Sequence, residues 1–188
     1  MEEKKTSTSG SGGFIPLFIL GFVGALIVGW WVFPQLLFSS KTQPIQFSHT
    51  VHTEQGMDCT ECHYFLENGQ YVGFPSTESC YACHADTTGG ETAAEKEIDK
   101  FVTEYGEKNA EIPWLTYQKQ PDNVYFTHSV HQNFECTTCH PDVATMTELP
   151  AYKENRISGY SKQTMKMWQC ERCHAEMGAS NACYVCHK

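Results

Sequence analysis

The first feature of the hydrophobic pattern is a long apolar run near the start of the chain. Residues Phe14–Phe38 are 25 consecutive positions with one strongly polar side chain, Gln35. About 20 apolar residues in a helix are enough to cross a bilayer. The run is longer than the apolar part of a signal peptide, and no small-residue cleavage site follows it. We therefore expect an uncleaved transmembrane helix over 14–38, with a cleaved signal peptide as the alternative. The polar residues 1–13 are expected to form a flexible tail.

Beyond the apolar run, the pattern predicts short elements separated by irregular segments. Residues 91–105 have the helical period, and Gly106 follows as a stop signal. Residues 112–126 are expected to be extended and interrupted at 121–123. The polar, basic segment 152–167 is expected to be a solvated loop in preference to a docking surface. The residues expected on one side of the 91–105 helix are Ala94, Ile98, Phe101, Val102 and Tyr105.

The chemistry of the chain is carried by the motif C-x-x-C-H, which occurs five times. This motif is the attachment signal of c-type haem. The two thiols bond to the porphyrin, and the histidine that follows binds the iron. The five copies, which use all ten cysteines, are Cys59, Cys62 and His63; Cys80, Cys83 and His84; Cys136, Cys139 and His140; Cys170, Cys173 and His174; and Cys183, Cys186 and His187. We therefore predict five covalently attached haems, each with one proximal histidine.

Other uses of paired cysteines fit this pattern less well. Zinc sites contain C-x-x-C pairs but do not need a histidine directly after every pair. A thioredoxin-like C-x-x-C needs a surrounding βαβ pattern, and none is visible. A disulfide framework is plausible in an oxidising compartment, but it does not explain five identical spacings that each end in histidine. Haem attachment is therefore the favoured interpretation.

The sequence also contains an internal repeat. Segments 47–52 and 126–131 both follow the pattern F-x-H-x-V-H, 79 residues apart, and the C-x-x-C-H motifs after them begin 77 residues apart. Such similarity indicates duplication of a structural unit. We expect repeat-like units over residues 44–90 and 123–175, with the fifth motif, 183–187, added at the C-terminal end.

The histidines outside the motifs occur only in these two segments. They are His49, His52, His128 and His131. Residues three apart lie on one face of a helical turn, and each pair is expected to supply distal ligands to two different irons, one local and one distant. Ordinary surface histidine is the alternative. Four haems then have two histidine ligands, and one has only its motif histidine.

The remaining iron needs a ligand of another kind. Methionine sulfur is an established haem ligand, and Met146 and Met165, between the third and fourth motifs, are the first candidates. For any single methionine, packing is the more common role. An open iron and a ligand from another subunit are the alternatives.

The charge of the chain narrows the choice of partners. The net charge is −9, and from residue 42 onward 10 Lys and Arg stand against 20 Asp and Glu. Nucleic acid is not an expected partner, because its binding needs clustered Lys and Arg. A basic protein partner is favoured through long-range steering, and acidity that serves only solubility is the alternative.

These features define the expected fold class and location. Residues 39–188 number 150, or 30 per haem, too few to build a large apolar core as well. We expect a mainly α-helical, loop-rich, haem-packed multihaem cytochrome c with one N-terminal transmembrane helix, whose folding depends on haem. Covalent haem attachment takes place outside the bacterial cytoplasmic membrane. Residues 39–188 are therefore expected in the periplasm and residues 1–13 in the cytoplasm.

The F-x-H-x-x-H segments ahead of C-x-x-C-H resemble the cytochrome c3/c7 class. A fuller resemblance rests on the anchor, on residues 121–128 and on residues 164–168. It extends to the multihaem cytochrome subunits of two membrane complexes: the quinone reductase complex (Qrc) of sulfate-reducing bacteria and alternative complex III, whose cytochrome is pentahaem. Residues 159–163 and the compact C-terminus favour the first.

The resemblance to Qrc implies an electron-transfer subunit that is not catalytic alone. Such a subunit takes electrons from a basic periplasmic cytochrome c3 and passes them through iron–sulfur and molybdopterin-oxidoreductase-like subunits. The electrons reach menaquinone at an integral membrane subunit, whereas in alternative complex III they flow outward from quinol. Qrc cytochromes are usually hexahaem, whereas this chain has five motifs. A sixth haem that is bound non-covalently or held by a partner subunit is therefore a further possibility.

Two other function classes are weighed against this one. The chain resembles small quinol dehydrogenases of the NapC/NrfH type in its single anchor. In those proteins, however, a methionine closely follows the first motif, whereas Tyr64 and Phe65 follow His63 here. A multihaem reductase with an open catalytic iron is the other alternative, although no C-x-x-C-K variant marks a special haem. Stable partner subunits after gentle purification distinguish the favoured class from both.

Overall fold

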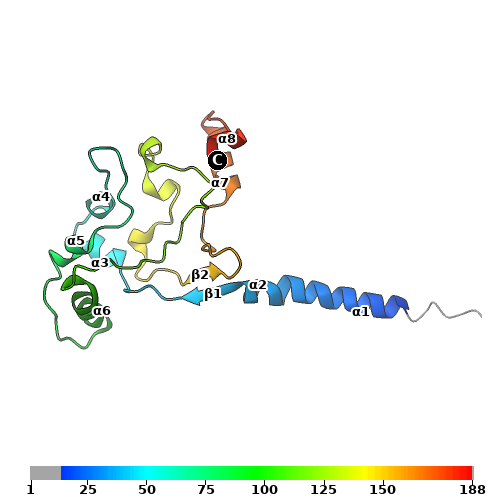
Figure 1. Ribbon diagram of the computed structural model, residues 1–188, viewed down its shortest axis with the longest axis horizontal. Coiled ribbons are helices and arrows are strands. Elements are labelled where there is room, and N and C mark those ends of the chain that lie inside the picture. The colour runs from blue at the N-terminus through cyan, green and yellow to red at the C-terminus, as the bar shows by residue number, and fades with distance from the viewer. Residues whose placement is uncertain (1–13, 188) are drawn as a thin grey trace, which may run out of the picture.

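The N-terminal part of the chain forms one long helix that projects away from the rest of the protein (Figure 1). The computed structural model describes residues 14–187, and the predicted tail, residues 1–13, lies outside the described residues. The helix comprises α1 (Phe14–Ile27), a π-helical segment, η2 (Val28–Val32), and α2 (Phe33–Leu37). Its 24 residues are long and apolar enough to cross a membrane, by length and composition.

The π-helical segment has a physical cause in the residue that follows it. Pro34, near the start of α2, has no amide hydrogen and cannot continue the α-helical hydrogen-bond ladder. Widening the preceding turn lets the helix continue past the proline. The helix ends at Leu37, one residue earlier than expected, because Phe38 adopts the extended conformation, with φ −110° and ψ 135°.

The rest of the described chain consists of short helices, long irregular segments and one small sheet. This confirms the expected fold class. The strands are β1 (Phe38–Lys41) and β2 (Tyr152–Asn155). The helices are α3 (His49–Glu54), α4 (Cys59–Cys62), α5 (Thr77–Tyr81), α6 (Ala93–Phe101), η3 (Val102–Gly106), η4 (His128–Val130), η5 (Cys136–Thr138), η6 (Val143–Thr145), α7 (Met167–Glu176) and α8 (Cys183–Cys186).

The sheet joins the end of the long helix to the C-terminal half of the chain. Strands β1 and β2 are antiparallel, with Phe38 opposite Asn155 and Lys41 opposite Tyr152. The prediction that 152–167 is a solvated loop is therefore wrong, since β2 is paired and Tyr152, Ser161 and Thr164 are buried. Strand β1, which pairs with this segment, lies more than 100 residues earlier in the sequence. Its first residue, Phe38, belongs to the apolar run.

The apolar core beyond the sheet is small and centres on α6. Ile45, Phe101 and Val102 form its buried cluster, and Ile98 and Tyr105 pack against it. The predicted helix is therefore confirmed, although Ala94 is exposed. It begins at a capping box, in which Thr92 accepts a hydrogen bond from the Glu95 amide and the Glu95 side chain accepts one from the Thr92 amide.

Gly106 has a packing role. A Cβ atom at this position would lie 2.4 Å from Cδ2 of Tyr81, so only glycine lets the backbone approach the Tyr81 ring. The left-handed residue after the helix is instead Asn109, with φ 45°. The helix therefore ends at Gly106, as predicted. The reason for the glycine is its packing against Tyr81, and not a left-handed backbone conformation.

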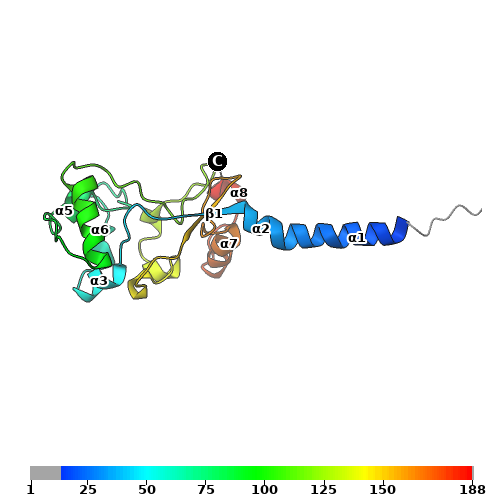
Figure 2. The same cartoon turned by 90° about the horizontal axis from the view of Figure 1, so that it is seen from below.

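The second motif and the last two motifs lie at opposite ends of the body. Figures 1 and 2 both show α5 and α6 at the end farthest from α1, and α7 and α8 at the end nearer α2. The body is therefore elongated, with one end close to the long helix and the other remote from it.

Candidate functional site

The first F-x-H-x-V-H segment forms a compact ring cluster at the start of α3. The Ser48 side chain caps the helix by accepting a hydrogen bond from the Val51 amide. The Phe47 ring lies between the two histidines, with ring centroids 4.8 Å from His49 at 84° and 4.4 Å from His52 at 21°. The phenylalanine therefore separates the two imidazoles, which point in different directions.

The second segment repeats this geometry. Thr127 caps η4 through the Ser129 amide. The Phe126 ring lies 4.9 Å from His128 at 86° and 4.9 Å from His131 at 26°. The sequence reasoning singled out the histidines and missed the roles of the phenylalanine and the capping hydroxyl. Their signal was present, because both segments read F-[ST]-H-[ST]-V-H.

Each of these four histidines lies beside one motif histidine. The ring centroids are 6.2 Å apart for His52 and His84, and 6.3 Å apart for both His128 with His140 and His131 with His174. Burial lowers the pKa of His49, and the nearby His63 lowers it further, so these two are neighbours as well. The pairs are therefore His49 with His63, His52 with His84, His128 with His140, and His131 with His174.

The spacing of the rings fits one metal ion between them. Metal–imidazole bonds are about 2 Å long and a ring centre lies roughly 1 Å behind its nitrogen, so two opposed ligands have centroids about 6 Å apart. Three pairs, His52 with His84, His128 with His140 and His131 with His174, thus have the placement that an iron with two axial histidines needs.

Hydrogen bonds hold several of the imidazoles in one orientation. Nδ1–H of His52 donates to the Ser48 carbonyl and that of His131 to the Thr127 carbonyl, both at 2.8 Å. Among the motif histidines, His63 donates to the Gly73 carbonyl at 2.6 Å, and His174 donates to the Ser180 carbonyl at 3.2 Å. A carbonyl can only accept, so the proton is on Nδ1 and Nε2 is left free to bind a metal.

A lowered pKa at three of these histidines favours the neutral form that binds metal. Burial lowers the pKa of His84, His128 and His140, and neighbouring histidines lower each of them further. Nδ1 of His49 is buried and has no hydrogen-bond partner among residues 14–187. A buried polar atom without a partner is costly.

Neighbouring thiols and imidazoles show which motifs are adjacent. None of the ten cysteines forms a disulfide bond. Burial raises the pKa of Cys80, with Cys62 adding to the shift. Burial likewise raises the pKa of Cys139 and of Cys170, the first with a contribution from Cys173 and the second with contributions from Cys186 and Cys139. The second motif is therefore beside the first, the third beside the fourth, and the fourth beside the fifth.

Two further residues connect the first motif with the third. Burial lowers the pKa of His140, and His63 contributes in the same direction. The Tyr71 ring stacks on His128, with centroids 4.1 Å apart at 26°. Burial raises the pKa of Tyr71, and Cys136 and Cys59 raise it further. The five motifs are thus arranged in the order second, first, third, fourth, fifth.

The fifth motif has a different environment from the others. Helix α8 is held by a hydrogen bond of 2.7 Å from the Tyr125 amide to the Cys186 carbonyl. In the described part of the chain, no second histidine ring pairs with His187. Of the two candidate methionines, Met165 has its sulfur 3.7 Å from that of Cys170. Met146 follows η6, which instead packs on α3 through a hydrogen bond from Thr50 to the Ala144 carbonyl.

The site residues do not assemble a site for a bare metal ion. Within residues 14–187, no group of three or more His, Cys, Asp or Glu converges in the way that such an ion needs. Two opposed imidazoles with two thiols beside one of them suit an iron that a porphyrin already holds on four sides. The residues present therefore fit c-type haem.

The first comparison with known proteins defines the class. Residues 45–100 match the family model described as cytochrome c7 and related cytochrome c. This range contains the first F-x-H-x-V-H segment and the first two motifs. The protein is a multihaem cytochrome c, which binds haem c and transfers electrons.

The second comparison covers nearly the whole chain. It is 47% identical, over 196 aligned positions, to the menaquinone reductase multihaem cytochrome c subunit of Nitratidesulfovibrio vulgaris. The alignment includes 94% of this chain and 91% of the relative. The chain belongs to this family of multihaem cytochrome c subunits, which confirms the resemblance to the quinone reductase complex.

Proposed function

We propose that the chain is the electron-relay subunit of a menaquinone-reducing membrane complex and holds five haems c. The ten motif cysteines attach the haems, and the five motif histidines are the proximal ligands. His49, His52, His128 and His131 are the distal ligands in the pairs described above. The observation that carries the proposal is the separation of 6.2–6.3 Å between the imidazoles of three pairs, which matches one iron between the two rings; His49 is assigned to His63 because His63 adds to burial in lowering the pKa of His49.

Met165 is the favoured second ligand of the fifth site. Its sulfur lies beside Cys170, and that cysteine neighbours Cys186 of the fifth motif. Met146 is the weaker candidate, because it follows a turn that packs on α3 at the first two sites.

The chain holds its five sites in a row. A bound haem supplies a reversible one-electron couple whose potential depends on axial ligands and burial. The protein residues set the order of the sites, and the row runs from the α5–α6 end to the α7–α8 end (Figure 1). At four sites a bound haem iron would take both of its ligands outside the porphyrin from a histidine pair, which would leave no position for a substrate there. The chain is therefore a relay and is not catalytic alone.

The long helix is the membrane anchor of this relay. Residues 14–37 span the inner membrane, the haem-binding part that begins at residue 39 lies in the periplasm, and residues 1–13 lie in the cytoplasm. The units at 44–90 and 123–175 each hold two sites, and the fifth motif is added to the second unit. Electrons leave the row through iron–sulfur and molybdopterin-oxidoreductase-like subunits toward menaquinone at an integral membrane subunit.

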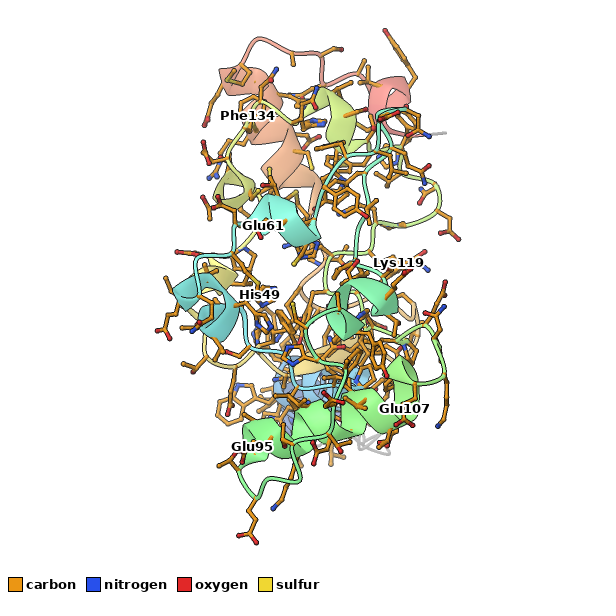
Figure 3. The ribbon with its side chains drawn as sticks, turned by 90° about the vertical axis from the view of Figure 1, so that its left-hand side faces the viewer. His49, Glu61, Glu95, Glu107, Lys119 and Phe134 are labelled. Carbon is orange, nitrogen blue, oxygen red and sulfur yellow. The ribbon has the colours of Figure 1, made fainter. Side chains whose placement is uncertain are left out.

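The remote end of the row receives the electron donor. Residues 78–111 contain nine Asp and Glu and three Lys, a net charge of −6. These residues include α6, whose Phe101 meets the His84 ring edge-on at 6.5 Å. Figure 3 views the body from this end, with Glu95 near the start of α6 and Glu107 at the end of η3, which continues it. An acidic surface beside the second site fits a basic cytochrome such as a cytochrome c3.

The first expected result concerns the number of haems. The intact mature chain should carry five haem additions by mass spectrometry, because each motif offers two thiols and one histidine. Replacing Cys183 and Cys186 with Ser should leave four, since α8 ends the row and no other motif uses these thiols. A mature wild-type chain with fewer than five additions would contradict the assignment of all ten cysteines.

The second expected result tests whether the electron donor docks at the acidic end of the body. Reduction of the complex by a basic cytochrome c3 should slow steeply with added salt, because screening shortens the reach of the −6 end. Glu104→Gln with Glu107→Gln should lower the association rate several-fold. The matched control, Glu171→Gln with Glu176→Gln on α7, removes the same charge at the other end and should change it little.

Two outcomes would contradict the proposed function. If the rate of reduction does not depend on salt or on Glu104 and Glu107, the donor does not dock at the acidic end of the body. Turnover of a menaquinone analogue by the isolated chain would show that it is not a relay subunit, because only the whole complex is expected to reduce the quinone.

A further inference from the structure

A rigid turn of the chain lies beside the end of the membrane helix. The amide of Arg156 donates a hydrogen bond of 2.8 Å to the carbonyl of Leu37, the last residue of α2. Strand β1 leaves the helix, and β2 runs back toward it. The turn after β2, residues 155–160, therefore lies level with the end of the helix, and Figure 1 shows this segment next to α2.

The level of this turn corresponds to a membrane surface. A helix of 24 residues is about 36 Å long, whereas the hydrocarbon core of a bilayer is about 30 Å thick. If the helix spans the bilayer as proposed, Leu37 lies at the headgroups. The turn beside it then lies at the same depth.

The turn is held in one conformation by its own hydrogen bonds. Oδ1 of Asn155 accepts hydrogen bonds from the amides of Ile157 and Ser158, at 2.9 and 3.1 Å. Gly159 takes the left-handed conformation, with φ 73°, and donates to the Asn155 carbonyl at 2.8 Å. This arrangement leaves Ile157 79% exposed, the second highest exposure among the large hydrophobic residues of positions 14–187.

Two lysines face each other directly behind the turn. The amide of Lys162 donates to the Lys153 carbonyl at 2.8 Å, and Glu154 is bridged to Ser161, so Lys153 and Lys162 are opposite residues of an antiparallel pair. Like charges in such positions repel. Both side chains are exposed, and an anion between them would relieve the repulsion.

The same surface continues to the membrane helix. Nζ of Lys162 lies 5.5 Å from the centre of the Phe38 ring, at the first residue after α2. The acidic residue nearest in sequence, Glu154, is already paired with Lys41. The surface formed by Lys153, Arg156 and Lys162 is therefore basic, in contrast to the acidic remote end.

We propose that residues 153–162 form a lipid-binding turn: Ile157 enters the headgroup layer, and Lys153, Arg156 and Lys162 bind the phosphates of anionic phospholipids. A basic residue near an anionic surface is worth about 1 kcal/mol, and an exposed apolar side chain adds by burial at the acyl boundary. The contact fixes the tilt of the haem-bearing body on the membrane. The inference rests on the proposed membrane anchor.

The test places a photoreactive residue, p-benzoylphenylalanine, at position 157 of the full, haem-loaded chain in lipid nanodiscs. Position 20 in the membrane helix and position 108 at the remote end are the controls. Illumination should give lipid adducts at 157 and 20, but not at 108. Adducts at 157 should be stronger with phosphatidylglycerol than with phosphatidylcholine alone. Lys153→Gln with Lys162→Gln should lower them on the order of thirtyfold, about fivefold for each lysine, whereas the matched pair Lys96→Gln with Lys108→Gln should leave them unchanged.

The outcomes separate this inference from the proposed function. Lipid adducts at 20 without adducts at 157 would overturn the lipid-binding turn and leave the anchor intact. No lipid adduct at 20 would overturn the anchor and the turn together. In the whole complex in its own membranes, an adduct of position 157 with another polypeptide would assign this surface to a partner subunit and overturn the lipid assignment.

Discussion

A chain produced without haem attachment is expected to lose its tertiary structure from residue 39 onward. The only apolar residues buried in the described chain are Ile45, Phe101, Val102 and Tyr152, too few to offset the chain entropy of a body of this size. Bound haems supply the missing apolar surface, as metals do in small metallodomains. The effect is expected to equal the whole free energy of unfolding, about 5–15 kcal/mol for an ordinary domain.

Limited proteolysis and circular dichroism of the haem-free and haem-loaded chains measure this loss. The helix of residues 14–37 is the internal control, because its backbone hydrogen bonds are satisfied within the helix and it persists in detergent or lipid. In the haem-free chain, the body should be cleaved throughout while this helix stays protected. A protease-resistant haem-free body would show that the protein, and not the cofactor, makes the core.

Replacing His128 with Met is expected to raise the potential of the third haem and trap an electron in the middle of the row. The imidazole of His128 faces His140, and this site lies between the first and the fourth. Axial ligands set haem potentials over a range of about 0.8 V, and methionine in place of histidine raises them. We expect a rise on the order of 0.1 V for one of the five haems.

Redox titration followed by electron paramagnetic resonance measures this change, and stopped-flow reduction by cytochrome c3 shows slower filling of the last two sites. His52→Met is the matched control, because it makes the same exchange at the second site, at the end of the row. The two variants should shift different haems. If neither changes any haem spectrum, the distal assignment is wrong, and if both shift the same haem, the pairing of rings is wrong.

Residue spacing was enough to predict the kind of protein, the anchor and the candidate ligands. Each of these depends on contacts within a few residues: two thiols and a histidine in five positions, two histidines in one turn, and a run of apolar side chains. The helix near residues 93–106 was also predictable, because its period and capping box are local. Its exposed Ala94 and the packing role of Gly106 were not predictable, because both depend on neighbours distant in sequence.

The tertiary structure alone decided which histidine faces which motif and how the sites follow one another. His52 lies nearer in sequence to His63 but faces His84, and His131 faces His174 across 43 positions of the chain. Ring placement depends on how Phe47 and Phe126 split each pair of histidines. The two segments share that local pattern, so which motif histidine each ring faces is set by segments that are distant in sequence.

By itself, the sequence determined a multihaem cytochrome c with one N-terminal helix apolar enough to cross a membrane, because haem-attachment motifs and apolar runs are read from short stretches of chain. Only the folded chain placed a basic turn beside the end of the membrane helix and an acidic surface at the remote end. The physical reason is that β1 and β2 pair across more than 100 residues. Hydrogen bonds of this kind join backbone groups, and they leave almost no trace in the side-chain pattern.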